Sequence, residues 1–319
     1  MESKRTLLRG VTICFVAFAL ALVLLPLIGS SKVGLARAWA GQSPDAEILF
    51  SLRFPRVLLA AAAGGALAVA GLLFQALLRD ALADPYTLGI SSGSALGAVI
   101  AICFRLPAVG LAALVGAAGV LAVVMTLASR GRRISAFTLL LAGVTVNSLS
   151  IAAVLFFHSM ADFSQSFQIV RWLMGGIESV SYQTLALLAG VVIPATAFLI
   201  FHARDWNLLS MGEDWAEARG VAAASLLRKG FAAGALLTAA ATCLTGPIGF
   251  IGWMVPHALR LWVGADHRVL IPCSFLAGAA YLALCDTIAR TLLAPSEIPV
   301  GVITSLLGGP FFLWMLRRL

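Results

Sequence analysis

Long apolar runs alternate with short polar breaks along almost the whole chain. A helix that crosses a bilayer needs about 20 apolar residues. By that length the sequence divides into ten predicted spans: 11–28, 55–78, 87–104, 108–128, 134–157, 182–203, 230–246, 248–263, 269–289 and 299–316. The seventh and eighth spans are short, and only Gly246 and Pro247 separate them. An even number of spans places both termini on one side of the membrane.

The longest polar stretch, residues 204–229, lies between the sixth and seventh spans. It carries eight charged side chains, so we expect it to lie in water. Ser210 and Glu213 have the spacing of a capping box and Gly220 is a typical helix terminator, which predicts a short helix over about 211–219. The stretch is either an ordinary solvated loop or a handle by which a soluble partner moves the membrane part.

The composition indicates an integral membrane protein. Hydrophobic residues make up 61% of the 319 residues and charged residues 11%, which leaves too little polar surface to coat a soluble core. The net charge of +8 does not indicate nucleic-acid binding, because the basic residues are scattered between apolar runs. The run 11–28 follows basic residues as a signal peptide would, but its length and the lack of a clear cleavage site favour a retained span.

Lysine and arginine predict the orientation, because they are enriched on the cytoplasmic side of membrane proteins. With the N-terminus inside, fifteen of the 22 basic residues fall in cytoplasmic segments and seven in outer segments. This distribution predicts cytoplasmic N- and C-termini and places residues 204–229 in the cytoplasm.

Two interrupted helices occupy similar places in the two halves of the chain. One break, residues 84–94, contains Pro85 and Gly89, and the other, residues 246–256, contains Gly246 and Pro247. Broken helices in corresponding positions indicate a transporter built from inverted repeats. Glycine and alanine at four-residue spacing in the spans let helix backbones approach closely, which favours a compact bundle.

No catalytic constellation stands out in the sequence. The polar residues at membrane depth are neutral: Gln75, Thr145, Asn147, Ser148, Thr238 and Thr242. A proton- or sodium-coupled carrier usually buries carboxylates in mid-span, whereas the carboxylates here fall near predicted span ends. The five cysteines and four histidines lack metal-ligand spacing, so we expect no metal site and no bound cofactor. No GxxxxGK[ST] loop is present, so the chain cannot bind ATP in the usual way and any energy must come from elsewhere.

Three arginines lie at predicted outer span ends. Arg53 and Arg56 flank Pro55 at the start of the second span, and Arg290 follows Asp286 by four residues. They are either interfacial side chains, with a local pair between Asp286 and Arg290, or exposed cations that meet carboxylates of a docking protein.

Five sequence segments carry a family resemblance. They are RFPRVLLAAAAGGALAVAGLLFQALLRDALADPYTLGISSGSALG (53–97), LLLAGVTVNSL (139–149), RWLMGGI (171–177), GPIGFIGWMVPHALRLWVGADHRVLIP (246–272) and EIPVGVITSLLGGPFFLW (297–314). Together they resemble the FecCD/BtuC permeases, the membrane subunits of ABC importers for iron-siderophores, haem and cobalamin. The motif GPxGFxGxxxPHxxR is long and specific.

The resemblance implies a single all-α transmembrane permease domain over 1–319, with about ten spans and two related halves. It also implies a homodimer, two cytoplasmic ABC ATPase subunits and an extracytoplasmic substrate-binding protein. By this analogy Arg53, Arg56 and Arg290 meet acidic residues of the binding protein. The segment 211–221 resembles the coupling helix that contacts the ATPase, with these residues: Met211, Gly212, Glu213, Asp214, Trp215, Ala218, Arg219, Gly220 and Val221.

Two predicted cytoplasmic turns resemble an inner gate of the family, at Asp80 and Leu82 and at Ala136 and Phe137. The family often has Asn-Pro-Leu where this chain has Asp-Ala-Leu, and small hydroxyl residues where Ala136 and Phe137 stand. We therefore expect the gate position to carry over and its chemistry to differ.

The sequence predicts the permease subunit of an ATP-driven importer for a metal chelate in the bacterial inner membrane. Two other classes are open at this point. An ion-coupled secondary transporter would work without ATPase subunits, and a membrane scaffold would transport nothing. Neither alternative accounts for an amphipathic helix in the predicted cytoplasmic loop.

Overall fold

The computed structural model describes residues 2–31, 33–81, 83–128 and 136–316. Within these ranges the regular elements are all helical. The α-helices are α1 (Glu2–Leu24), α2 (Leu35–Trp39), α3 (Phe54–Leu78), α4 (Ile90–Cys103), α5 (Val109–Ala128), α6 (Ala136–Ser159), α7 (Phe163–Leu173), α8 (Tyr182–Phe201), α9 (Ala203–Met211), α10 (Glu213–Ala218), α11 (Ala223–Thr245), α12 (Ile251–Val263), α13 (His267–Thr291) and α14 (Val300–Leu316). Two short helical turns, Leu25–Leu27 and Glu47–Arg53, precede α2 and α3.

Each of the ten predicted spans has a helix in the structure, so the predicted all-α polytopic fold is confirmed. In the part of the chain that the structure describes, six helices are long and apolar enough to cross a membrane: α1, α3, α5, α6, α8 and α13. The helices α4 and α14 are apolar but shorter. The α12 helix has only 13 residues, because an irregular segment occupies the start of its predicted span.

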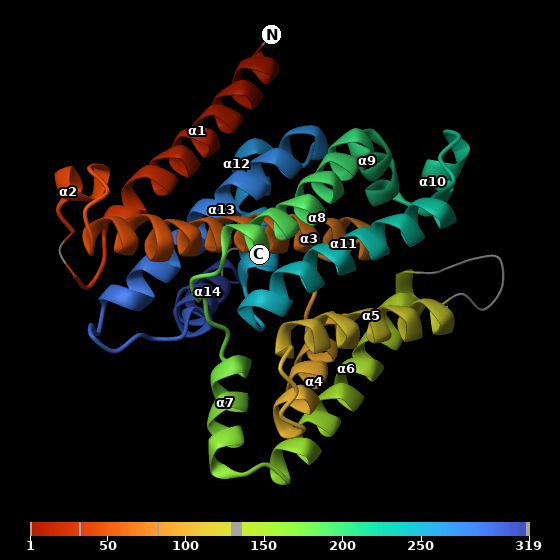
Figure 1. The fold of residues 1–319 in the computed structure, drawn as a ribbon. Helices are drawn as coiled ribbons and strands as arrows, with labels where there is room; N and C mark the ends of the chain where they lie inside the picture. The colour runs from red at the N-terminus through yellow and green to blue at the C-terminus, as the bar shows by residue number, and fades with distance from the viewer. Residues whose placement is uncertain (1, 32, 82, 129–135, 317–319) are drawn as a thin grey trace.

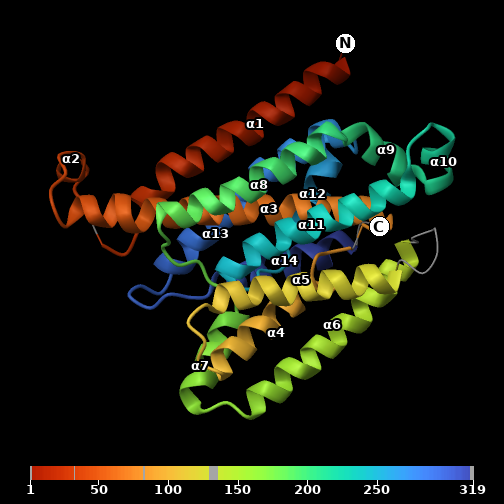
Figure 2. The same ribbon diagram turned by 45° about the vertical axis from the view of Figure 1, so that its right-hand side comes forward.

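The α3 helix forms the centre of the bundle. It contacts α8, α11, α12 and α13, and Figures 1 and 2 show α4, α5, α6 and α7 grouped on the side opposite to α1. Glycines allow these contacts: a Cβ on Gly64 would lie 2.3 Å from the carbonyl oxygen of Gly278 in α13. Backbones that touch directly gain the close van der Waals packing on which helix association in lipid depends.

The bundle has two ends, which we name by what lies there. The Arg56 end holds the start of α3, where Arg53 bonds to carbonyl oxygens beyond the end of α1. The α10 end holds the last residues of α3, where Arg79 pairs with Glu213 of α10. Figure 2 shows α2 at one extremity and α10 at the other, with the start of α1 on the α10 side.

The predicted capping box at Ser210 is wrong. The α9 helix continues through Met211, so Ser210 lies in its last turn and donates to the carbonyl of Asn207 at 2.9 Å. Gly212, with φ of 139°, separates α9 from α10 and caps α10 without a side-chain bond. The seventh span also begins earlier than predicted, because α11 starts at Ala223.

Candidate functional site

A cavity of about 680 Å³ lies among α4, α6, α7, α14 and the segment before α12. Its lining residues are Tyr86, Ser91, Ser92, Ala95, Asn147, Ile151, Leu173, Met174, Pro247, Gly249, Gly301, Val302, Ser305 and Leu306. The two interrupted helices that the sequence singled out, 84–94 and 246–256, therefore meet on one cavity. Its polar lining groups are hydroxyls, amides and backbone, and none of these lining side chains carries a formal charge.

Close backbone contacts build one wall of this cavity. The Gly301 amide donates to the carbonyl of Gly175 at 3.3 Å, and the Gly176 amide donates to Thr245 at 2.8 Å. A Cβ on Gly301 would lie 2.1 Å from the carbonyl oxygen of Met174. The three segments RWLMGGI, GPIGF and EIPVG thus need glycine where their backbones cross.

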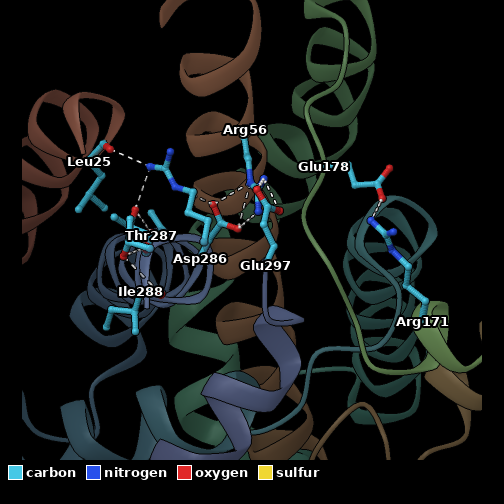
Figure 3. A network of polar contacts seen from close by, with 11 residues as sticks. Leu25, Arg56, Arg171, Glu178, Asp286, Thr287, Ile288 and Glu297 are labelled. Atoms are coloured by element: carbon cyan, nitrogen blue, oxygen red, sulfur yellow. Dashed lines mark hydrogen bonds and ion pairs between the residues drawn. The ribbon is translucent and has the colours of Figure 1, made fainter. Parts of the chain in front are cut away.

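Figure 3 shows an ionic network at the Arg56 end. Arg56 donates to Asp286 from Nη2 at 2.9 Å and to Glu297 from Nη1 at 2.9 Å. Arg290 donates to the carbonyl of Leu25 at 2.8 Å and lies 3.8 Å from Asp286. The predicted local pair of Asp286 and Arg290 is therefore present, but Arg56 makes the shorter contact.

The docking hypothesis expected exposed cations, but the three arginines of this network are largely buried. Arg53 and Arg290 are each only 6% exposed, and the Arg56 side chain is 15% exposed. Their hydrogen bonds join α3 to α13 and tie both to the segment that follows α1. A role in docking stays a prediction for Arg53, Arg56 and Arg290. A binding protein would meet side chains that are already partly covered.

The predicted coupling segment projects from the α10 end (Figure 1). Met211 is 64% exposed and Trp215 is 51% exposed, whereas Ala216 is fully buried. The Arg219 guanidinium lies 4.1 Å from the centre of the Trp215 ring, which stiffens the exposed face by a cation–π contact. The remaining predicted residues of the segment are exposed or half-buried: Gly212, Glu213, Asp214, Ala218, Gly220 and Val221.

The α9 helix anchors that segment. Trp206 is fully buried and donates from Nε1 to the carbonyl of Leu199 at 3.0 Å. Asn207 donates to Asp266 at 2.8 Å and accepts from the His267 backbone amide at 2.9 Å. The polar stretch 204–229 is thus partly buried, because α9 packs on α3 and α13.

Asp266 lies between α12 and α13 and accepts the hydrogen bond from Asn207 that helps to hold α9 in place. Its burial opposes ionisation, but hydrogen bonds from Arg268 and Asn207 outweigh burial and lower the pKa of Asp266 to about 2. The carboxylate is therefore ionised at neutral pH, where it caps α13 and holds α9.

The predicted gate residues lie on two separate elements. Asp80 follows the end of α3 and is exposed. Ala136 is buried at the start of α6, and the neighbouring Phe137 is 73% exposed. Leu82 lies outside the described residues. These placements leave the gate a prediction.

The sequence analysis missed the partners of two polar side chains. Asp286 is fully buried and faces Arg56, and Gln75 accepts a hydrogen bond from Arg260 at 3.0 Å. The first pair is 230 residues apart and the second 185. Neither pair has a local sequence signal, because the contacts join distant helices.

A helical bundle with a neutral cavity that opens to its surface and a projecting amphipathic segment defines a polytopic membrane permease. The chain belongs to the FecCD transport family, which matches residues 13–318. The resemblance seen in the sequence is thus confirmed. The chain is a transport permease subunit and not an enzyme, since the ATPase is a separate subunit in such systems.

Two curated relatives extend over nearly the whole chain. The hemin transport system permease protein HmuU of Yersinia pestis is 40% identical, with 94% of each chain covered. The vitamin B12 import system permease protein BtuC of Vibrio cholerae is 37% identical, with 93% of this chain and 90% of the relative covered.

Solved structures agree on the fold. An inward-facing ABC transporter assigned to the metal-chelate type has a TM-score of 0.85 at 30% identity, with 97% of this chain and 100% of that chain covered. PsaBC from Streptococcus pneumoniae has a TM-score of 0.57 at 17% identity, with 88% of this chain and 94% of that chain covered, and shows likeness of fold alone.

Proposed function

We propose that the chain is the permease of an ATP-driven importer for a bulky metal chelate such as haem, a cobalamin or an iron-siderophore. The observation that carries this proposal is the cavity on which both interrupted helices meet. A neutral wall suits a large ligand that a separate binding protein selects and delivers. The hemin and vitamin B12 permeases among the relatives support this substrate class.

The two ends of the bundle receive different partners in this proposal. The α10 end faces the cytoplasm of a bacterial cell, as the distribution of basic residues favours, and two ATPase subunits bind the face around Met211 and Trp215. A substrate-binding protein docks at the Arg56 end. Two copies of the chain enclose the substrate path, and the copies rock between outward- and inward-open forms.

An inner gate near Asp80, Leu82, Ala136 and Phe137 closes this path toward the cytoplasm. Phe137 supports the assignment, because its ring is 73% exposed at the α10 end and is free to fill a passage. In this chain an apolar ring then closes the gate at a position where small hydroxyl residues are common in the family.

Reconstitution in proteoliposomes tests the function. Permease, ATPase and loaded binding protein should take up hemin or cyanocobalamin only when ATP is supplied. Uptake driven by an ion gradient without the ATPase would instead favour the secondary transporter. A complex that moves neither probe nor a ferric siderophore would overturn the proposed substrate class.

A double substitution tests the coupling segment. Trp215→Ala with Gly220→Leu should abolish uptake, because the φ of 82° at Gly220 favours glycine and a leucine there distorts the segment. The dimer should stay assembled, because Gly220 is exposed and no described atom lies within 4 Å of a Cβ there. Normal uptake by that variant would contradict the assignment of 211–221.

A further inference from the structure

Gln75 is a buried amide on α3 that faces the first turn of α12. It is 3% exposed. Its Nε2 lies 3.3 Å from the carbonyl oxygen of Gly252 and 3.5 Å from that of Trp253. A buried amide of this kind costs free energy unless its groups are bonded, so these contacts fix where α12 lies against α3.

The Gly252 carbonyl needs a donor from another helix because Pro256 stands four residues later in α12. In a regular α-helix the amide of residue 256 would donate to this carbonyl, but proline has no N–H group. The Gln75 side chain supplies the missing donor. It reaches the carbonyl because the two backbones touch one turn earlier, where a Cβ on Gly71 would lie 1.8 Å from the same oxygen.

Arg260 holds the amide in the orientation that this bond requires. Its Nη2 donates to Gln75 Oε1 at 3.0 Å. Since a guanidinium can only donate, the Gln75 oxygen must face Arg260, and the nitrogen must face Gly252. One side chain of α3 thereby bridges positions before and after Pro256 in α12.

The α12 helix connects the cavity with the α10 end. Pro247 and Gly249, just before it, line the cavity, and Trp253 packs edge-on against Phe312 of α14 at 4.5 Å between ring centres. Beyond its last residue, Asp266 bonds to Asn207 of α9. A displacement of α9 and α10 can therefore reach the cavity wall through α12.

We propose that Gln75 is a positioning residue of the transport cycle, which replaces the helical bond removed by Pro256 and so lets α12 move as one piece. Without that bond α12 would bend at Gly252 and absorb the motion that arrives from α10. The inference rests on the proposed function, since it assigns to α12 the transfer of ATPase motion to the cavity.

The Gln75→Leu variant tests the proposal in the complete importer. We expect uptake of hemin or cyanocobalamin per ATP hydrolysed to fall on the order of ten-fold, the effect of leaving one buried group unbonded, with hydrolysis within about two-fold of the wild type. Thr238→Val is the matched control, because Thr238 is also buried and its bonds to described residues all lie within its own helix. An unchanged ratio in Gln75→Leu, or an equal loss in Thr238→Val, would overturn the proposal.

A second substitution tests the missing donor itself. Pro256→Ala returns an N–H group to α12, so Gln75→Leu should lower the uptake ratio far less in a Pro256→Ala background than in the wild type. The wild type, the two single variants and the double variant can also be compared by their unfolding midpoints in detergent. This measurement does not depend on transport. Additive effects in both readouts would overturn the role of Gln75, whereas a wild-type complex that moves no substrate would count against the proposed function alone.

Discussion

Arg56 of α3 and Asp286 of α13 form a two-pronged ion pair inside the bundle. Nη2 of Arg56 lies 2.9 Å from one carboxylate oxygen and Nε lies 3.1 Å from the other. Asp286 is fully buried, so its charge depends on this guanidinium for compensation. Removal of one partner from a buried pair leaves an uncompensated charge, which is far more costly than loss of a surface pair.

We expect Asp286→Asn to destabilise the permease by about 3–5 kcal/mol, because Arg56 and Arg290 then keep their charges without a buried carboxylate. Thermal unfolding in detergent micelles measures the effect. Glu297→Gln is the control: the Glu297 side chain is 53% exposed, and exposed pairs are worth about 0–1 kcal/mol. Equal shifts of the two midpoints would show that burial does not set the cost.

Glu297 also affects docking, because its carboxylate already accepts hydrogen bonds from Nη1 of Arg56. A carboxylate from a binding protein has to compete with Glu297 for this side chain. Glu297→Gln should therefore tighten the binding of that protein several-fold, with the larger gain at low ionic strength. Arg56→Gln should weaken it. Unchanged affinity in both variants, measured by surface plasmon resonance on reconstituted permease, would remove Arg56 from the docking surface.

Gly71 is the position at which α3 and α12 come closest. In Gly71→Ala the new Cβ would lie 1.8 Å from the Gly252 oxygen, so the helices must separate, at about 1–3 kcal/mol or more. Gly119→Ala in α5 is the matched control, since no atom lies within 4 Å of a Cβ there. Unfolding midpoints should fall only for the first variant. A comparable fall in Gly119→Ala would point to backbone effects unrelated to this contact.

The sequence predicted a helix for each of the ten spans because each long apolar run forms one, but it did not predict α2, α7 or α9. It also predicted that the segments around Pro85 and Pro247 interrupt helices, since proline and glycine act locally. It could not predict that Arg53 and Arg290 are buried, because their carbonyl partners, Leu27 for Arg53 and Leu25 for Arg290, lie just after α1 and far away in sequence. The capping box at Ser210 failed because tertiary packing of Trp206 extends α9 beyond it.

The Asp266 carboxylate gives the stability of the α10 end a defined pH dependence. Its pKa is about 2, below the ordinary value of 3.8. A group with a lowered folded-state pKa contributes stability that is complete above its unfolded pKa and is lost as the pH falls through the folded pKa. Asp266→Asn should therefore lower the unfolding midpoint at neutral pH, and its difference from the wild type should shrink between about pH 4 and pH 2.

The exposed Asp214 of α10 provides the control for this prediction. Asp214→Asn removes a carboxylate from the same end of the bundle for which no ion pair or hydrogen bond is seen among the described residues, so it should leave the unfolding midpoint at neutral pH close to that of the wild type. The bonds from Asn207 and Arg268 to Asp266 are the physical reason for the difference. A pH-independent gap between Asp266→Asn and the wild type would mean that amide and carboxylate differ there in packing and not in charge.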